Sequence, residues 1–207
     1  MVIGIDFDNT IVCYDRLFHR VAVERGLVPA DVPSTKGSVR DYLRQCDREH
    51  LWTELQGYVY GARMREALPF PGVREFLSRC KRLRVPTRII SHKSLHPFLG
   101  PKYDLHAAAH HWLGTHGFYE THLTGLSPLH VHFELTKADK LTRISQAGCT
   151  WFIDDLPEFL AEAEFPSGAE RILFDPNAQL RADSRRRTAH SWSEVEEIIL
   201  CGTSLRT

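Results

Sequence analysis

Three short apolar segments, far apart in the chain, each end in polar side chains that can do chemistry. These side chains are Asp6 and Asp8, then Ser91, then Asp154 and Asp155. Clustered carboxylate oxygens suit Mg²⁺, and they repel one another unless a cation lies between them. A carboxylate can also attack phosphorus, and a second acid can protonate the leaving oxygen and later activate water. These residue types therefore favour Mg²⁺-assisted phosphoryl transfer.

Two lysines precede the third of these segments. Lys137 and Lys140 lie near the start of a predicted helix, from which an ammonium group can reach the end of the following strand. A lysine and a hydroxyl such as that of Ser91 can hold phosphoryl oxygens while negative charge develops on them.

The elements that must position these residues alternate between strand and helix. Apolar runs predict strands at 2–7, 87–90, 151–153 and 171–174. Helical periodicity and end signals predict helices at 73–83, 137–147, 156–163 and 193–200, with Thr136 and Ser193 as N-caps. This alternation indicates an α/β fold: a doubly wound, Rossmann-like parallel sheet with helices on its faces. Right-handed crossovers bring the carboxyl ends of the strands to one side, where ligands bind.

Two stretches interrupt this alternation. Residues 14–68 are predicted to be mostly helical, with a loop at 28–37. Residues 92–136 are irregular and rich in histidine, with a helix near 105–113 and a possible short strand at 122–124. Such a long connection is unusual in a compact core and could face a substrate.

Composition restricts the partners and the compartment. The 207 residues carry a formal net charge of zero, so no global field favours nucleic acid or an anionic membrane. The run Arg185-Arg186-Arg187 is short, which favours a solvated turn over a binding patch. Five scattered cysteines without a CxxC pair argue against a disulfide framework. There is neither a signal peptide nor an apolar run of about 20 residues, so we expect a cytoplasmic protein.

In chain order, the motifs Asp6-Phe7-Asp8-Asn9-Thr10, Ile90-Ser91, a helix-start lysine and Ile153-Asp154-Asp155 resemble the four motifs of the haloacid dehalogenase (HAD) superfamily. The resemblance implies a core domain formed by 1–13 and 70–207, with a small helical C1-type cap at 14–69. Caps of this kind close over substrate and exclude water.

The resemblance also implies a role for each motif residue. Asp6 would be the nucleophile and a Mg²⁺ ligand, and Asp8 the general acid/base, with a backbone carbonyl on the metal. Thr10 would fix the position of Asp8, and Ser91 would bind the phosphoryl group. Asp154 would complete the metal shell, with Asp155 as a ligand or a support. The second aspartate, which the dehalogenases of the superfamily lack, favours phosphoester chemistry.

The third motif and the substrate contacts are less defined. Lys140 is favoured over Lys137 as the phosphate-binding lysine, because Leu141 and Ile144 mark the buried side of that helix and similar phosphatases have a comparably close lysine. Both lysines remain candidates. The candidate substrate-binding residues are Asn9, His92, Lys93 and Lys137.

The histidines offer a different kind of site. Nine of the twelve lie between His92 and His132. His106 and His110 are spaced i, i+4 and could share a helix face as zinc ligands. No cysteine or carboxylate joins them at a recognisable spacing, so packing or hydrogen bonding is the favoured interpretation.

The expected function is a Mg²⁺-dependent phosphatase that hydrolyses a small phosphorylated metabolite through an aspartyl-phosphate. Two alternatives remain: a phosphotransferase or mutase of the same fold, and a regulatory protein that binds a phosphorylated ligand without turnover. The identity of the substrate and the oligomeric state are not encoded in any motif of this sequence.

Overall fold

A computed structural model describes residues 1–178, 180 and 187–201. The chain forms two compact units, each built from segments that are distant in the sequence. The first unit contains Met1–Ile11, Pro69–His92 and the chain from Gly117 onward, and the second contains Val12–Leu68 and Lys93–His116. The second unit thus joins part of the histidine-rich stretch to the predicted cap segment. Compactness alone does not define a domain, so the division at 14–69 stays a prediction.

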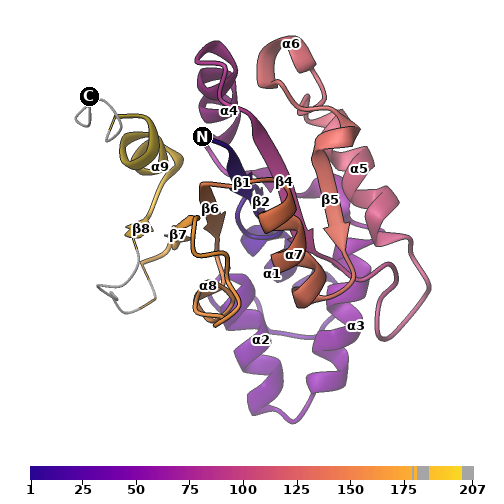
Figure 1. Ribbon diagram of the computed structural model, residues 1–207. Coiled ribbons are helices and arrows are strands. Elements are labelled where there is room, and N and C mark those ends of the chain that lie inside the picture. Colours follow the sequence, from indigo (N-terminus) through magenta and orange to yellow (C-terminus); the bar gives the residue numbers. More distant parts are fainter. Residues whose placement is uncertain (179, 181–186, 202–207) are drawn as a thin grey trace. The chain divides into compact units, whose positions relative to one another are not determined.

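The first unit is built on a six-stranded sheet (Figure 1) whose strand order is β5-β4-β1-β6-β7-β8 and whose neighbouring strands pair in parallel. The strands are β1 (Ile3–Ile5), β4 (Thr87–His92), β5 (Val131–Glu134), β6 (Trp151–Asp154), β7 (Glu170–Phe174) and β8 (Arg187–Ala189). Numbered along the chain, this is the 3-2-1-4-5-6 order of doubly wound folds, and it reverses direction at β1. The predicted fold class is confirmed.

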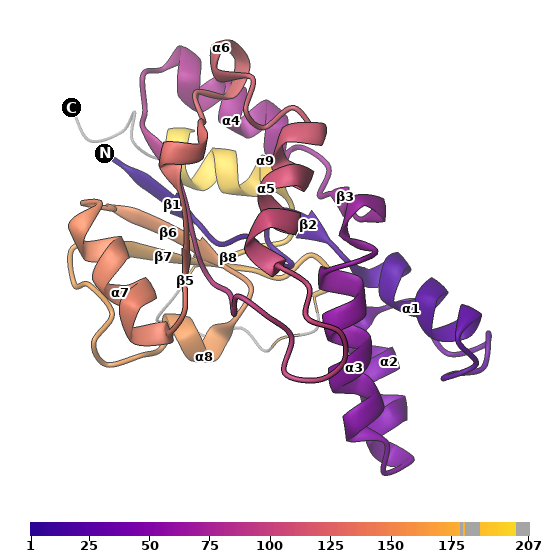
Figure 2. The same ribbon diagram turned by 90° about the vertical axis from the view of Figure 1, so that its right-hand side faces the viewer.

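Helices lie on both faces of this sheet (Figure 2). The helices of this unit are α4 (Val73–Arg82), α6 (Thr121–Thr124), η2 (Pro128–His130), α7 (Lys137–Gln146), α8 (Pro157–Leu160), α9 (Trp192–Glu196) and η3 (Glu197–Cys201). On one face, Phe152 packs with Leu141 of α7 and Phe159 of α8 in one buried cluster. On the other, Trp192 of α9 packs against Phe76 of α4 and Phe174 of β7, with ring centroids 5.1 and 5.5 Å apart.

The second unit is helical. It contains α1 (Asp15–Glu24), α2 (Lys36–Gln45), α3 (Glu49–Tyr60), η1 (Met64–Glu66) and α5 (Leu105–Thr115). Phe18 lies between Trp52 and Tyr60, with centroid distances of 5.1 and 5.6 Å. The segment that begins at Lys93 packs directly on α3, because a Cβ added to Gly57 would lie 2.6 Å from Pro97 Cβ. Two short strands, β2 (Val12–Cys13) and β3 (Leu68–Pro69), form a separate two-stranded sheet.

Two local predictions are wrong. Residues 122–124 belong to α6 instead of a strand, because the Thr124 and Gly125 amides donate to the Glu120 and Thr121 carbonyls at 3.0 and 3.1 Å and close a helical turn there. The last helix begins at Trp192, and its N-cap is Ser191, whose Oγ accepts from the Glu194 amide at 3.2 Å. Arg187 opens β8, whereas Arg185 and Arg186 lie outside the described residues.

Within the described part of the chain, no helix combines the length and the apolar character needed to cross a membrane.

Candidate active site

The carboxylates meet where the strand order of the sheet reverses. β1 lies between β4 and β6, with Ile5 opposite both Ile89 and Ile153. The Asp6 amide donates to the Ile153 carbonyl at 2.9 Å, which extends this pairing by one residue. Asp6 and Asp154 therefore stand side by side at the carboxyl ends of β1 and β6, the place where doubly wound sheets bind ligands.

Lys140 joins these two carboxylates. Its Nζ lies 2.6 Å from Asp6 Oδ1 and 2.6 Å from Asp154 Oδ2. The side chains of Lys140, Asp6 and Asp154 are 3%, 7% and 0% exposed, so both charge-assisted bonds are shielded from water. These bonds connect three motifs, since one spans 134 residues of the chain, from Asp6 to Lys140, and the other spans 14, from Lys140 to Asp154.

The local sequence explains why Lys140 points inward. Thr136 caps α7, because its Oγ1 accepts from the Asp139 amide at 3.0 Å. Lys140, Leu141 and Ile144 form the buried face of this helix. The ammonium group also lies 4.1 Å from the centroid of the Phe159 ring on α8, a cation–π contact.

The electrostatics of the cluster follow from burial. Burial raises the pKa of Asp6 to about 7; nearby Lys140 opposes this shift, and Asp154 and Asp8 add to it. Burial also acts to lower the pKa of Lys140, but Asp6 and Asp154 outweigh it, so the net direction is upward and the ammonium stays charged. The cluster thus combines three carboxylates, Asp6, Asp8 and Asp154, with one lysine, an excess of acidic groups that a divalent cation would balance.

The acidic group has the composition of a Mg²⁺ site. Asp6, Asp154 and Asp155 each offer an oxygen, and these oxygens lie within 4.8 Å of one another. Two oxygens on opposite sides of Mg²⁺ are about 4.2 Å apart, so small side-chain movements would suffice. Asp154 Oδ1 also accepts from the Leu156 amide at 2.9 Å, which fixes the orientation of this carboxylate. The residues present therefore fit the metal.

The loop after β1 holds the rest of the first motif. Asn9 has a left-handed backbone, with φ of 59°, which a short amide side chain tolerates. Thr10 is completely buried, and its carbonyl accepts from the Trp192 indole at 3.2 Å. Its hydroxyl has no hydrogen-bond partner among the described residues, so the role of Thr10 in fixing the position of Asp8 stays a prediction. Asp8 itself is half-buried and lies close enough to Asp6 to influence its charge.

Ser91 and His92 end β4, next to β1 in the sheet, and Ser91 is buried. Burial lowers the pKa of His92, as do the positive charges of Lys140 and Lys137. Lys93, the next residue, belongs to the second unit. It is buried there, with its ammonium 4.9 Å from the centroid of the Tyr60 ring.

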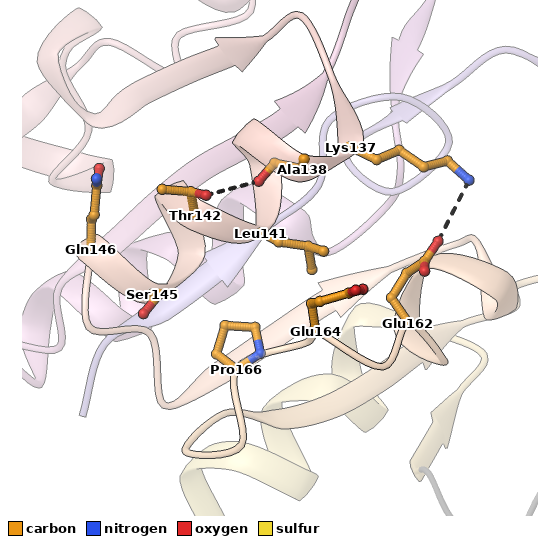
Figure 3. Close-up of a pocket in the computed structure, with 9 residues that line it drawn as sticks. All are labelled: Lys137, Ala138, Leu141, Thr142, Ser145, Gln146, Glu162, Glu164 and Pro166. Atoms are coloured by element: carbon orange, nitrogen blue, oxygen red, sulfur yellow. Dashed lines mark hydrogen bonds and ion pairs between the residues drawn. The ribbon is translucent and has the colours of Figure 1, made fainter.

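Lys137 does not join the carboxylates. Its Nζ lies 4.0 Å from Glu162 Oε1, and its side chain is 47% exposed. Figure 3 shows Lys137 on the rim of a surface cavity of about 680 Å³ along the outer side of α7, with Glu162 and Glu164 opposite. Lys140 is thus the lysine that the structure brings to Asp6, whereas Lys137 is directed to this outer groove.

His106 and His110, spaced i, i+4, do not form a metal site with other ligands among the described residues. His106 Nε2 forms a 2.8 Å hydrogen bond with the Lys93 carbonyl. Among the residues that the structure describes, the group of Asp6, Asp154 and Asp155 was found to suit a metal, and neither His106 nor His110 belongs to such a group.

Two residues that contact the site lie outside the sequence motifs. Phe159 packs against the ammonium of Lys140, and Trp192 anchors the loop after Asp8 from the far end of the chain. The sequence gives no indication that Trp192 is near the site. For Phe159 there is a weak indication, since it lies in the predicted helix that directly follows Asp154-Asp155.

Comparisons with known proteins identify the fold. No protein-family model and no curated protein matches the chain. Among solved structures, a HAD-family hydrolase from Deinococcus radiodurans with bound phosphate and sodium superposes with a TM-score of 0.59, 17% identity and coverage of 98% of this chain and 96% of that chain. A predicted phosphoglycolate phosphatase from Haemophilus somnus gives 0.57 at 14% identity, with 95% and 96% covered. A putative HAD hydrolase from Bacillus subtilis bound to magnesium gives 0.50 at 11%, with 96% and 98% covered.

At these identities the likeness establishes the fold. The chain therefore has the fold of the HAD-superfamily hydrolases, as the motif order predicted.

Proposed function

We propose that this protein is a Mg²⁺-dependent phosphatase that hydrolyses a small phosphorylated metabolite through a phosphoaspartate at Asp6. The observation that carries the proposal is the position of the Lys140 ammonium, 2.6 Å from carboxylates of two separate motifs. A buried lysine between two aspartates costs desolvation, and a hydrophobic replacement would often be more stable. Such an arrangement is well suited to charge stabilisation at a reacting centre.

Asp6 is the proposed nucleophile. One of its carboxylate oxygens attacks phosphorus while the bond from phosphorus to the leaving oxygen breaks. Asp8, two residues along the same loop, gives its proton to that leaving oxygen. Asp8 then takes a proton from water, and this water attacks phosphorus to release phosphate and regenerate Asp6.

The other residues of the site hold and neutralise the phosphoryl group. Lys140 and the Ser91 hydroxyl are proposed to bind the phosphoryl oxygens, and Asp6, Asp8, Asp154 and Asp155 to hold the metal. Bound Mg²⁺ would supply charge neutralisation for the phosphoryl oxygens. Asn9, His92, Lys93 and Lys137 remain proposals as substrate contacts. Exposed Lys137, paired with Glu162, is the weakest of them.

The names of the structural neighbours support a hydrolase without selecting a substrate. One neighbour is called a predicted phosphoglycolate phosphatase and another carries bound magnesium. A HAD fold alone also accommodates dehalogenation, so the preference for a phosphoester rests on Asp8.

The test is the rate of aryl phosphate hydrolysis with Mg²⁺ and with EDTA, followed by a panel of phosphorylated metabolites. We expect Mg²⁺-dependent turnover, reduced at least about a thousandfold in Asp8→Asn, because proton transfer serves both half-reactions. Folded protein that hydrolyses nothing at any pH or metal concentration would instead favour the ligand-binding alternative. Phosphate transfer to an added alcohol in preference to water would favour the phosphotransferase.

A further inference from the structure

A strongly basic segment runs along the first unit, although the whole chain has no net charge. Residues 73–88 contain one acid, Glu75, and six basic residues, which gives this segment a charge of +5 in a chain whose formal net charge is +0. The basic residues are Arg74, Arg79, Lys81, Arg82, Arg84 and Arg88. The apolar residues Val73, Phe76, Leu77 and Cys80 form the buried face of α4. The sequence alone does not reveal that several of these charges meet in one place.

Three of these basic residues meet in a cavity of about 320 Å³ at the amino end of β4. Lys81, Arg84, Arg88 and His130 line it, together with uncharged residues, and no carboxylate is among the lining residues. These four side chains come from α4, the loop after it, β4 and η2. Convergence from separate elements distinguishes the cavity from the basic last turn of a helix, which merely complements the helix dipole.

The cations of this cavity are available for a ligand. Within the described residues, the side chains of Lys81, Arg84 and Arg88 form no ion pair, and their one side-chain hydrogen bond is from Arg88 Nη1 to the Thr87 carbonyl at 2.9 Å. His130 Nδ1 accepts from the Ser127 amide at 3.2 Å, and the ring also hydrogen-bonds the Gly125 backbone, so the groups available to a ligand are Lys81, Arg84 and Arg88. The three cationic side chains of the lining are thus hydrogen-bond donors only.

Backbone geometry holds two of the lining residues in place. Gly125 has φ of +75°, and a Cβ there would lie 3.1 Å from Lys81 Cδ, so a glycine lets the lysine stem pass. Arg84 has φ of 56°, a left-handed conformation that glycine adopts more easily than arginine. An arginine therefore occupies a position where glycine would be more stable.

We propose that this cavity binds a small polyphosphate anion, such as the phosphate chain of a nucleotide or inorganic tripolyphosphate. Its volume is at the lower end of the range for small-molecule sites, and guanidinium groups match phosphate oxygens in pairs. No Phe, Tyr or Trp lines it, so it lacks the large aromatic rings on which proteins stack the bases of single-stranded nucleic acid. It lies about 16 Å from the candidate active site, since five residue steps of β4 separate Thr87 from His92. This site is independent of the proposed phosphatase activity.

The test is calorimetric titration of the whole protein with tripolyphosphate in EDTA, at physiological ionic strength. Without metal, the acidic candidate active site repels this probe. We expect binding that weakens at least about tenfold in Arg84→Gln/Arg88→Gln, because charge-assisted hydrogen bonds are lost. The control Arg40→Gln/Arg44→Gln removes two equal charges that are paired with Asp41 and Glu49, and its affinity should stay within about twofold of the wild type.

Arg84→Gly separates binding from folding. It should raise the melting temperature, because glycine relieves the left-handed backbone, and should still weaken tripolyphosphate binding. The proposal is overturned if the wild type binds tripolyphosphate no better than orthophosphate, or if the control pair loses as much affinity as the cavity pair. Tight binding of a short RNA without binding of tripolyphosphate would also overturn it, in favour of a nucleic-acid surface.

Discussion

Lys140 is the residue on which the candidate active site depends. It is buried between Asp6 and Asp154, where an uncompensated carboxylate would be costly. The sequence left two lysines as candidates because both lie within one helical turn of each other. The geometry distinguishes them: Lys140 faces the sheet, whereas Lys137 faces the outer groove and Glu162.

Lys140→Met should lower the free energy of unfolding of the metal-free protein by about 3–5 kcal/mol, because it leaves two buried carboxylates without their cation. Urea denaturation in EDTA measures this change. Lys137→Met is the matched control on the same helix, and we expect it to stay within about 0.5 kcal/mol of the wild type. Equal effects of the two substitutions would contradict the position assigned to Lys140.

Asp6 should make the stability of the metal-free protein depend on pH. Burial raises its pKa from 3.8 to about 7 in the folded state. The folded protein therefore retains the proton more strongly than the unfolded chain, and the stability from this group is complete below pH 3.8 and lost as pH rises through about 7. Asp6→Asn lacks this loss, so its stability relative to the wild type should increase between pH 4 and 7. Parallel pH profiles of the two proteins would refute this.

At the scale of elements, α7 positions the lysine, and its N-cap holds the start of the helix. Thr136→Ala should destabilise the protein by about 1 kcal/mol, because the Asp139 amide loses its acceptor. Thr142→Ala, at an exposed site in the middle of the same helix, serves as the control and should be neutral or slightly stabilising. Chemical denaturation of both variants tests the cap, and equal losses would argue against it.

The four strands with strong apolar runs could be predicted from the sequence, and two of them, β1 and β6, lead into the acidic motifs. β5 and β8 were not predicted. Val131–Glu134 alternates apolar and polar residues, a strand pattern hidden in a stretch dominated by histidine. Arg187–Ala189 has only three residues and little apolar character. Edge strands of this kind depend on pairing with a neighbour, which local sequence does not encode.

The residues of the candidate site could be predicted from the sequence, but the contacts that surround them could not. Residue types and strand-end positions identified Asp6, Ser91 and Asp154, because parallel topology brings such ends together. The unpartnered hydroxyl of Thr10, the contact of Phe159 with Lys140 and the anchoring by Trp192 depend on tertiary packing. No spacing rule in the sequence specifies them.

At the scale of the whole molecule, metal binding should stabilise the fold. Mg²⁺ at about 100 times its dissociation constant should add about 2.7 kcal/mol to the free energy of unfolding. Asp155→Asn should reduce this gain, whereas Asp31→Asn, an exposed acid in the second unit, should not. Melting curves with and without Mg²⁺ test this, and a gain in stability that is unchanged in Asp155→Asn would exclude Asp155 from the metal site.

The central claim is that Asp6 becomes phosphorylated during turnover. Acid quenching of the enzyme with substrate and Mg²⁺, then borohydride reduction and peptide mass spectrometry, would convert a phosphoaspartate into homoserine at its position. The account predicts homoserine at position 6 in the wild type, and neither homoserine nor turnover in Asp6→Asn. Phosphate release by an Asp6→Asn enzyme at the wild-type rate, or homoserine at another aspartate, would contradict it.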